Sequence, residues 1–198
     1  MLDISLVLPA YNEQDNIVKV VTSAADSLDQ LGKTWEIVVV DNHSNDKTPQ
    51  LVEELSLKDN RIRCIVHNEN KLYSGSCQTA LNEAKGKYIA IMDSDDQYAA
   101  SDILKFIEKL EKGANIVFGW RKKRKDPFFR LIVSKVFNSL GKFKLKFPFH
   151  DLNCGYRVFD KTFQQSCKIK HKINLSNPEL YVRAKQAGLK MDEVAIQH

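Results

Sequence analysis

In YIAIMDSDDQ, residues 88–97, a short apolar run ends in three carboxylates and an amide. The run predicts a buried strand, and the acids mark its exposed end. In an open α/β sheet, ligands bind outside the carboxyl ends of the strands, so acids placed there face a binding site. Carboxylates this close repel one another unless a cation lies between them. A site for a metal and a diphosphate is the first hypothesis. The alternative is a solvated acidic turn opening a helix that Ser101 and Asp102 cap.

Toward the N-terminus, three more apolar runs each end in polar residues and lead into helical periodicity. Strands are predicted at 4–8, 36–40 and 61–67, and helices at 17–31, 49–56 and 74–84. This alternation predicts an α/β fold with a doubly wound, mostly parallel sheet flanked by helices, and right-handed crossovers place the loops on one edge. Four residues should converge there as a nucleotide pocket: Tyr11, Asp41, Asp93 and Asp95.

Two other kinds of nucleotide-binding protein are excluded by their missing glycines. The loop after the first strand reads PAYNE, residues 9–13, without the G-x-G-x-x-G of a dinucleotide fold. Ser27 occupies the position at which a P-loop ending in Gly32-Lys33-Thr34 would need its first glycine. The four cysteines form no C-x-x-C pair, which disfavours zinc and indicates reduced, mostly buried thiols.

Composition is that of a globular protein with 198 residues, 43% hydrophobic and 28% charged, with a net charge of +5. No apolar run approaches the ~18 residues of a membrane span, and the start at Met1 lacks the basic residues of a signal peptide. We therefore expect one domain in the cytoplasm.

Three ordered motifs give the chain a recognisable pattern: LPAYNE at 8–13, VVDNHSNDKT at 39–48 and MDSDDQ at 92–97. Together they closely resemble the family 2 glycosyltransferases with a GT-A fold. Within that family the chain looks most like the branch of dolichol-phosphate mannose synthase and the polyprenyl-phosphate glycosyltransferases. Three later segments resemble the same branch: GWR at 119–121, DLNCGYR at 151–157 and NPELYVRAK at 177–185.

The resemblance implies a single GT-A domain over residues 1–198, with a nucleotide-sugar half at 1–97 and an acceptor half at 98–198. Its implied nucleotide-sugar residues are Pro9, Tyr11, Glu13, Asp41, Asp93 and Ser94. Its implied ligands for Mg²⁺ or Mn²⁺ are Asp93, Asp95 and Gln97. Its implied acceptor-phosphate residues are Arg121, Arg130, Ser134 and Arg157. Catalysis is assigned to Asp93, Asp95, Arg121 and Asp151.

Two departures from the family pattern fall in the expected pocket. Asn42 and His43 replace the usual Asp-Gly, and Leu72 stands where a glycine is common. They leave uridine and guanosine donors both open. The chain stops at His198, where relatives usually continue with a basic segment and often with transmembrane helices. There are two alternatives. The chain is an enzyme without its own anchor that works at the cytoplasmic face of the membrane, where a partner could anchor it, or it is a chain shorter than its relatives.

Cations gather in the second half of the chain. RKKRK at 121–125 lies beside a predicted strand end and before a helix expected from about residue 126, so anion capture is favoured over a solvated face. One short patch without an aromatic stacking platform does not indicate nucleic-acid binding. KFKLKFPF at 142–149 alternates cations with bulky apolar residues, which in an extended chain makes either a bilayer-facing surface or a half-buried strand.

The expected reaction is metal-dependent, inverting transfer of a sugar from GDP-mannose or a UDP-hexose to a polyprenyl or dolichyl phosphate. Such a phosphate has a second pKa near ~6, so its oxygen is anionic at neutral pH and needs no strong base. A first alternative is transfer to a sugar hydroxyl in cell-surface polysaccharide or glycolipid synthesis, with Glu179 or Asp151 as the base. A second alternative is a non-catalytic module that binds sugar nucleotides.

Overall fold

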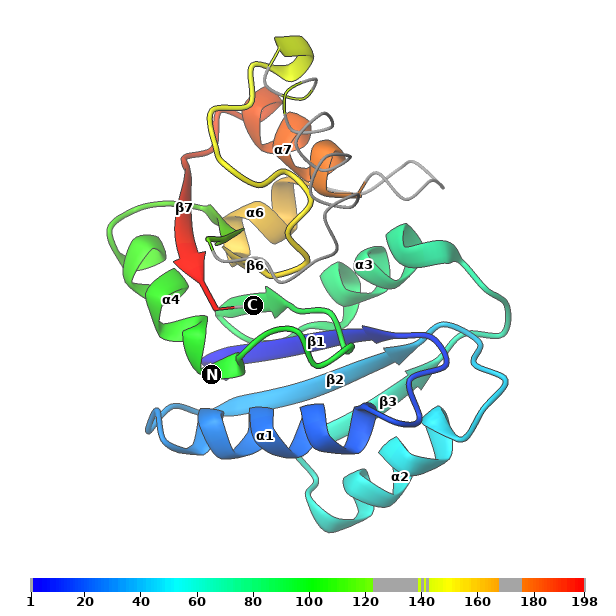
Figure 1. Cartoon of the computed structure of the whole chain (residues 1–198). Helices are drawn as coiled ribbons and strands as arrows, with labels where there is room; N and C mark the ends of the chain where they lie inside the picture. Colours follow the sequence, from blue (N-terminus) through cyan, green and yellow to red (C-terminus); the bar gives the residue numbers. More distant parts are fainter. Residues whose placement is uncertain (1, 123–138, 140, 142, 168–175, 198) are drawn as a thin grey trace.

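The computed structural model describes residues 2–122, 139, 141, 143–167 and 176–197. Within them, seven strands form one sheet in the order β3-β2-β1-β4-β6-β5-β7 (Figure 1). The strands are β1 (Ile4–Ala10), β2 (Trp35–Asp41), β3 (Ile62–Val66), β4 (Tyr88–Ile91), β5 (Ile116–Arg121), β6 (Arg157–Asp160) and β7 (Met191–Ile196). Only β6 runs against its neighbours β4 and β5. The doubly wound, mostly parallel sheet predicted from the sequence is confirmed.

Helices cover both faces of the sheet. They are α1 (Ile17–Asp29), α2 (Thr48–Lys58), α3 (Leu72–Glu83), α4 (Ile103–Glu111), α6 (Lys161–Ser166) and α7 (Ser176–Gln186), with a 3₁₀ turn η1 (Ala100–Asp102) before α4. One core lies between the sheet and α1, α2 and α4. The other lies between the sheet and α3, α6 and α7. Because both faces are covered, all residues of β1, β2 and β4 are buried, as their continuous apolar runs predict.

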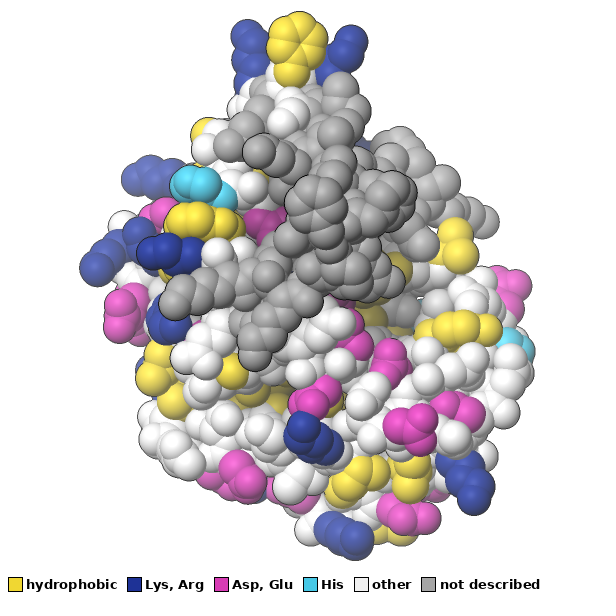
Figure 2. Space-filling model, viewed as in Figure 1, with side chains coloured by type: hydrophobic (Ala, Val, Ile, Leu, Met, Phe, Trp, Pro, Cys, Tyr) yellow, Lys and Arg dark blue, Asp and Glu magenta, His cyan; other side chains and the backbone are white. Residues whose placement is uncertain are grey.

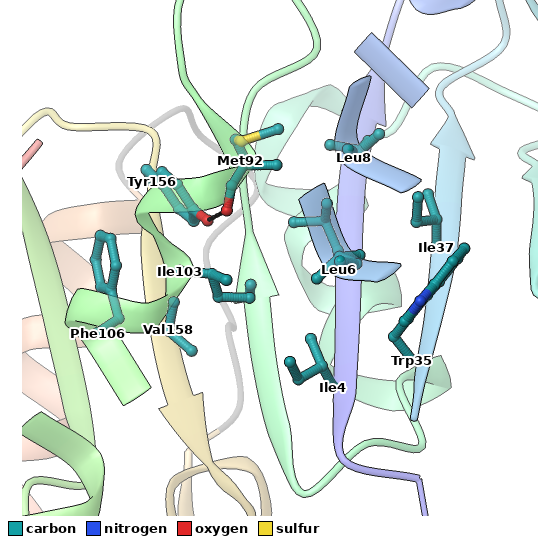
Figure 3. Packing of buried hydrophobic residues seen from close by; sticks show 14 of the residues in the cluster. Ile4, Leu6, Leu8, Trp35, Ile37, Met92, Ile103, Phe106, Tyr156 and Val158 are labelled. Carbon is teal, nitrogen blue, oxygen red and sulfur yellow. Dashed lines mark hydrogen bonds between the residues drawn. The ribbon is translucent and has the colours of Figure 1, made fainter. Parts of the chain in front are cut away.

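The first core continues under the second half of the sheet. Figure 3 shows Met92, which follows β4, beside Tyr156, which precedes β6, with Phe106 of α4 next to Tyr156. The Phe106 and Tyr156 rings lie 4.7 Å apart, and the Tyr156 hydroxyl donates to the Ala100 carbonyl at 3.2 Å. This packing places the segment 151–157 next to the end of β4, where the acidic motif begins.

Two local predictions are wrong. β1 was expected to end before Pro9 but continues to Ala10, because the missing N–H of Pro9 faces the side where pairing with β4 has already ended at Val7. Residues 143–145 are helical rather than extended. Phe147 is buried in the second core and Phe143 is 79% exposed, so the alternation at 142–149 does not separate two faces of a strand.

Candidate active site

A pocket of ≈ 360 Å³ lies at the ends of β1, β2 and β4. Its walls are formed by Pro9, Ala10, Tyr11, Glu13, Asn42, Asn70, Leu72, Tyr73, Ser76, Asp93, Ser94 and Asp95. The structure thus brings together Pro9, Tyr11, Glu13, Asp93 and Ser94 from the predicted nucleotide-sugar set. Tyr11 is 46% exposed, so its ring is available to a flat ligand.

Side chains from the loop after β2 hold the loop after β1. Thr48 accepts a hydrogen bond from the Glu13 backbone at 2.9 Å, and Ser44 accepts one from the Asn12 backbone at 2.9 Å. Thr48 is the first residue of α2, so the start of this helix holds Glu13 in place. On the other side, the Ser94 hydroxyl donates to the Pro9 carbonyl at 2.8 Å. These bonds bring the first and third motifs to one pocket.

Two carboxylates face this pocket from the end of β4. Asp93 accepts a hydrogen bond from the Tyr73 hydroxyl at 2.6 Å and lies against Gly155, where any Cβ would collide with its carboxylate. Burial and the adjacent Asp93 charge raise the pKa of Asp95 above its ordinary value. These two effects disfavour the negative form of Asp95, and a nearby cation would favour it.

These two acids fit a divalent cation. They supply hard oxygen ligands at one pocket, and a cation would relieve both the burial cost and the Asp93 repulsion that raise the pKa of Asp95. Among the described residues, no cluster of three His, Cys, Asp or Glu side chains surrounds them, so further ligands would come from water and substrate phosphates. Gln97 is exposed and absent from the pocket wall. Asp96 pairs at the surface with Lys19 at 2.5 Å.

Asp41 is not among the residues that line the pocket. It is fully buried, and its Oδ2 accepts a hydrogen bond from the Ser44 backbone at 3.0 Å. Its Oδ1 has no hydrogen-bond partner among the residues that the structure describes. The residue that the end of β2 presents to the pocket is the next one, Asn42. Because Asp41 does not line the pocket, the structure does not place its side chain in direct contact with a base bound there.

Sequence reasoning missed a polar network behind Asn42. The Asn42 Oδ1 accepts from the Lys71 backbone at 2.9 Å and lies 3.0 Å from Nδ1 of His67. The Asn42 Nδ2 donates to Asn70 at 3.0 Å. His67, which sequence reasoning left without a role, is buried here. Only the departure from the family pattern at Asn42 signalled this part of the site.

Arg121 and Asp151 form a buried ion pair. Nε and Nη2 of Arg121 donate to the two carboxylate oxygens at 2.7 and 3.1 Å. Burial acts to lower the pKa of Arg121, but the carboxylate outweighs it and the pKa is raised. With both oxygens of Asp151 engaged, the carboxylate is poorly placed to act as a general base. Nη1 of Arg121 makes no hydrogen bond within the described part of the chain.

The structure places Arg157 away from the role that the family resemblance implies. It had been expected to meet the acceptor phosphate, but it is fully buried, with Nη2 lying 2.9 Å from the Cys77 sulfur and 3.4 Å from the Tyr73 hydroxyl. Its position at the start of β6 turns it into the second core. Arg130 and Ser134 of the same predicted set lie outside the described residues. Glu179, the other candidate base, accepts from Arg183 at 3.1 Å within α7.

The comparisons with known proteins agree with this geometry. The model of glycosyl transferase family 2 matches residues 5–166. Undecaprenyl-phosphate 4-deoxy-4-formamido-L-arabinose transferase of Edwardsiella ictaluri is 27% identical over 157 residues, which are 79% of this chain and 48% of the relative. The Proteus mirabilis protein of that name is 28% identical with the same coverage. The chain thus spans about half the length of these relatives.

Solved structures share the fold. A mannosyltransferase from Pyrobaculum calidifontis in complex with GDP-Man and Mn²⁺ superposes with a TM-score of 0.71 at 19% identity, covering 97% of this chain and 54% of the other. Glucosyl-3-phosphoglycerate synthase from Mycobacterium tuberculosis, with Mn²⁺ and UDP-glucose, has a TM-score of 0.69 at 18% identity, covering 100% and 71%. From its match over residues 5–166, this chain belongs to glycosyl transferase family 2.

Proposed function

We propose that this protein transfers a sugar from a nucleoside diphosphate sugar, GDP-mannose or a UDP-hexose, to a polyprenyl phosphate, with inversion at the anomeric carbon. The observation that carries the proposal is that Asp93, Asp95 and the exposed residue Tyr11 line the same pocket. A flat aromatic face and paired acids in one pocket suit a ligand that carries both a base and a diphosphate.

Each wall has a part in the proposed reaction. Tyr11 provides the face for the base, and Asp93 and Asp95 would hold Mg²⁺ or Mn²⁺ next to the diphosphate. When bound, such an ion neutralises the charge that develops on the departing diphosphate. Tyr73 keeps Asp93 oriented through its 2.6 Å hydrogen bond, and burial raises the pKa of Tyr73 well above its ordinary value, so the hydroxyl remains a donor.

The acceptor is proposed to be a phosphate because the structure leaves no free base for a hydroxyl among the candidates named from the sequence. Asp151 is held by Arg121, and Glu179 is held by Arg183. A phosphate oxygen needs no such base, since its second pKa lies near ~6. The undecaprenyl-phosphate transferases among the relatives support the same acceptor class.

We propose that Arg121 guides this phosphate through Nη1, while Asp151 holds the other edge of its guanidinium. Residues 1–97 would then form the donor half and residues 98–198 the acceptor half. This division matches the sheet, in which β1 to β4 lie together on one side and β5 to β7 on the other.

A lipid acceptor calls for a membrane surface, and we propose the cytoplasmic face as the working location. No helix in the described ranges has the length and apolar character needed to cross a bilayer. Phe143 is 79% exposed, and Lys144 and Lys146 near it in the sequence are exposed too. Figure 2 shows Lys and Arg side chains around the upper part of the molecule. A membrane-anchoring partner remains part of the proposal.

The test is a donor panel in vesicles that contain undecaprenyl phosphate. GDP-mannose, UDP-glucose and UDP-galactose are supplied with Mn²⁺, and lipid-linked sugar is measured. We expect one donor class to label the lipid in the wild type and none to label it in Asp95→Asn. Labelling of a soluble oligosaccharide instead would establish the sugar-hydroxyl alternative, and nucleotide binding without any transfer would establish the non-catalytic one.

A further inference from the structure

The loop between β3 and α3 fixes the orientation of two carboxamides at the pocket wall. A backbone N–H can only donate, so the atom of Asn42 that lies 2.9 Å from the Lys71 nitrogen is its oxygen. The Leu72 nitrogen, 2.8 Å from Asn70, identifies the Asn70 oxygen in the same way. Both amides line the pocket. The loop backbone thus decides which end of each carboxamide is the oxygen.

This orientation decides the tautomer of His67. Its Nδ1 lies 3.0 Å from the Asn42 oxygen, which cannot donate, so Nδ1 carries the hydrogen. Its Nε2 then accepts from the Thr79 hydroxyl, 2.8 Å away. Burial, followed by the Lys71 charge, lowers the pKa of His67, while Asp41 acts in the opposite direction. The neutral ring therefore holds Asn42 from behind.

Hydrogen-bond accounting then shows what the wall offers to a ligand. The Asn42 oxygen is engaged by Lys71 and His67, and the Asn70 oxygen by Leu72 and the Asn42 amide nitrogen. The second N–H of Asn42 and both N–H groups of Asn70 have no acceptor within the described ranges. This part of the wall therefore presents donors and no spare amide oxygen. An Asp at position 42 would present an acceptor instead.

We propose that Asn42 and Asn70 bind a carbonyl oxygen of the donor's nucleobase and that His67 is a positioning residue that holds the Asn42 amide in its donating orientation. The proposal rests on the proposed function and deepens it by naming the residues that would recognise the base. Uracil and guanine carry a ring carbonyl oxygen, whose two lone pairs can accept from both amides at once, whereas each ring nitrogen of adenine has a single lone pair and can accept from one of them only. The site should therefore prefer UDP and GDP to ADP.

The first test is calorimetry of UDP, GDP and ADP binding to the full chain with Mn²⁺ present. Asn42→Asp keeps the shape and both accepting contacts of Asn42 but removes the donor. We expect it to weaken the tighter of UDP and GDP about tenfold and to leave ADP unchanged, the size of a lost hydrogen bond next to an uncompensated acceptor. Asn68→Asp, an exposed change of the same charge in the same loop and off the pocket wall, is the matched control and should leave all three affinities unchanged.

The second test separates positioning by His67 from a general structural role. The amide nitrogen of an Asn side chain can replace Nδ1 of His, whereas that of Gln replaces Nε2. His67→Asn should therefore keep the affinity for the preferred nucleotide within about threefold, and His67→Gln should lose about tenfold at comparable melting temperature.

Equal binding of all three nucleotides by the wild type, or an unchanged UDP and GDP affinity in Asn42→Asp, would overturn the inference while leaving the transferase proposal intact. Equal losses in both His67 variants would overturn the positioning role. A wild type that binds none of the nucleotides would overturn this inference and the proposed function together.

Discussion

Removing Asp151 should destabilise the protein strongly, because it leaves the Arg121 guanidinium buried without its counter-charge. The side chains of the pair are only 9% and 4% exposed, and two hydrogen bonds of 2.7 and 3.1 Å join them. Two charge-assisted hydrogen bonds at about 1.5–3 kcal/mol each give about 3–6 kcal/mol. Breaking a buried pair by removing one partner typically costs about 3–5 kcal/mol. We therefore expect Asp151→Ala to lower the free energy of unfolding by about 3–5 kcal/mol, which is a large part of the roughly 5–15 kcal/mol typical of a folded domain.

Urea denaturation of a double-mutant cycle measures this cost. Asp151→Ala and Arg121→Ala should each be strongly destabilising, and the double variant should cost clearly less than the sum, since neither charge is then left alone. The Lys19–Asp96 pair is the control: it is as short, at 2.5 Å, but 70% and 37% exposed. Asp96→Ala should therefore cost at most about 1 kcal/mol.

Two results would refute this reasoning. A loss below about 1 kcal/mol in Asp151→Ala, with additive effects in the cycle, would show that the pair does not stabilise the fold. Full stability of Asp151→Asn combined with complete loss of transfer would show that Asp151 acts as a base, which would favour a sugar-hydroxyl acceptor over a phosphate.

Three further outcomes can be checked by denaturation. Because the folded state raises the pKa of Asp95, the charged side chain destabilises the fold at neutral pH. Asp95→Asn should therefore have a higher melting temperature than the metal-free wild type. In a thermal-shift assay, Mn²⁺ should raise the melting temperature of the wild type but not that of Asp95→Asn. Leu72 adopts a φ of 59°, a conformation that costs a residue with a side chain about 1–2 kcal/mol. After the entropy cost of glycine is subtracted, Leu72→Gly should raise the free energy of unfolding, measured in urea, by up to about 1 kcal/mol. A lower free energy of unfolding would mean that the packing of the Leu72 side chain outweighs this strain. The folded state lowers the pKa of His67, so neutral His67 contributes to the free energy of unfolding above the unfolded pKa of about 6.5. This contribution is lost as the pH falls through the folded pKa, so the free energy of unfolding of the wild type should fall relative to that of His67→Asn between pH 7.5 and 5.5. Parallel curves of the free energy of unfolding against pH for the two proteins would contradict this.

Sequence alone determined the first half of the sheet and the place of the site. The runs at 4–8, 36–40, 61–67 and 88–92 correspond to β1 to β4. Apolar residues that continue without alternation indicate strands covered on both faces, and parallel strands bring their carboxyl ends to one edge. The convergence of Tyr11, Asp93 and Asp95 follows from that local pattern, which needs no knowledge of packing.

The pairing of polar groups depends on how the chain packs in three dimensions. Arg121 meets Asp151 across 30 residues, and Asn42 meets His67 across 25, so no local spacing announces either contact. Nothing in the sequence distinguishes a free arginine from one already held by a carboxylate. The same limit explains Phe147: its alternation with lysines records a period, but the face that is buried depends on where α7 and β5 pack. The chemistry of a side chain determines what it can bind, whereas long-range packing determines which hydrogen-bond or ion-pair partner lies next to it in the folded protein.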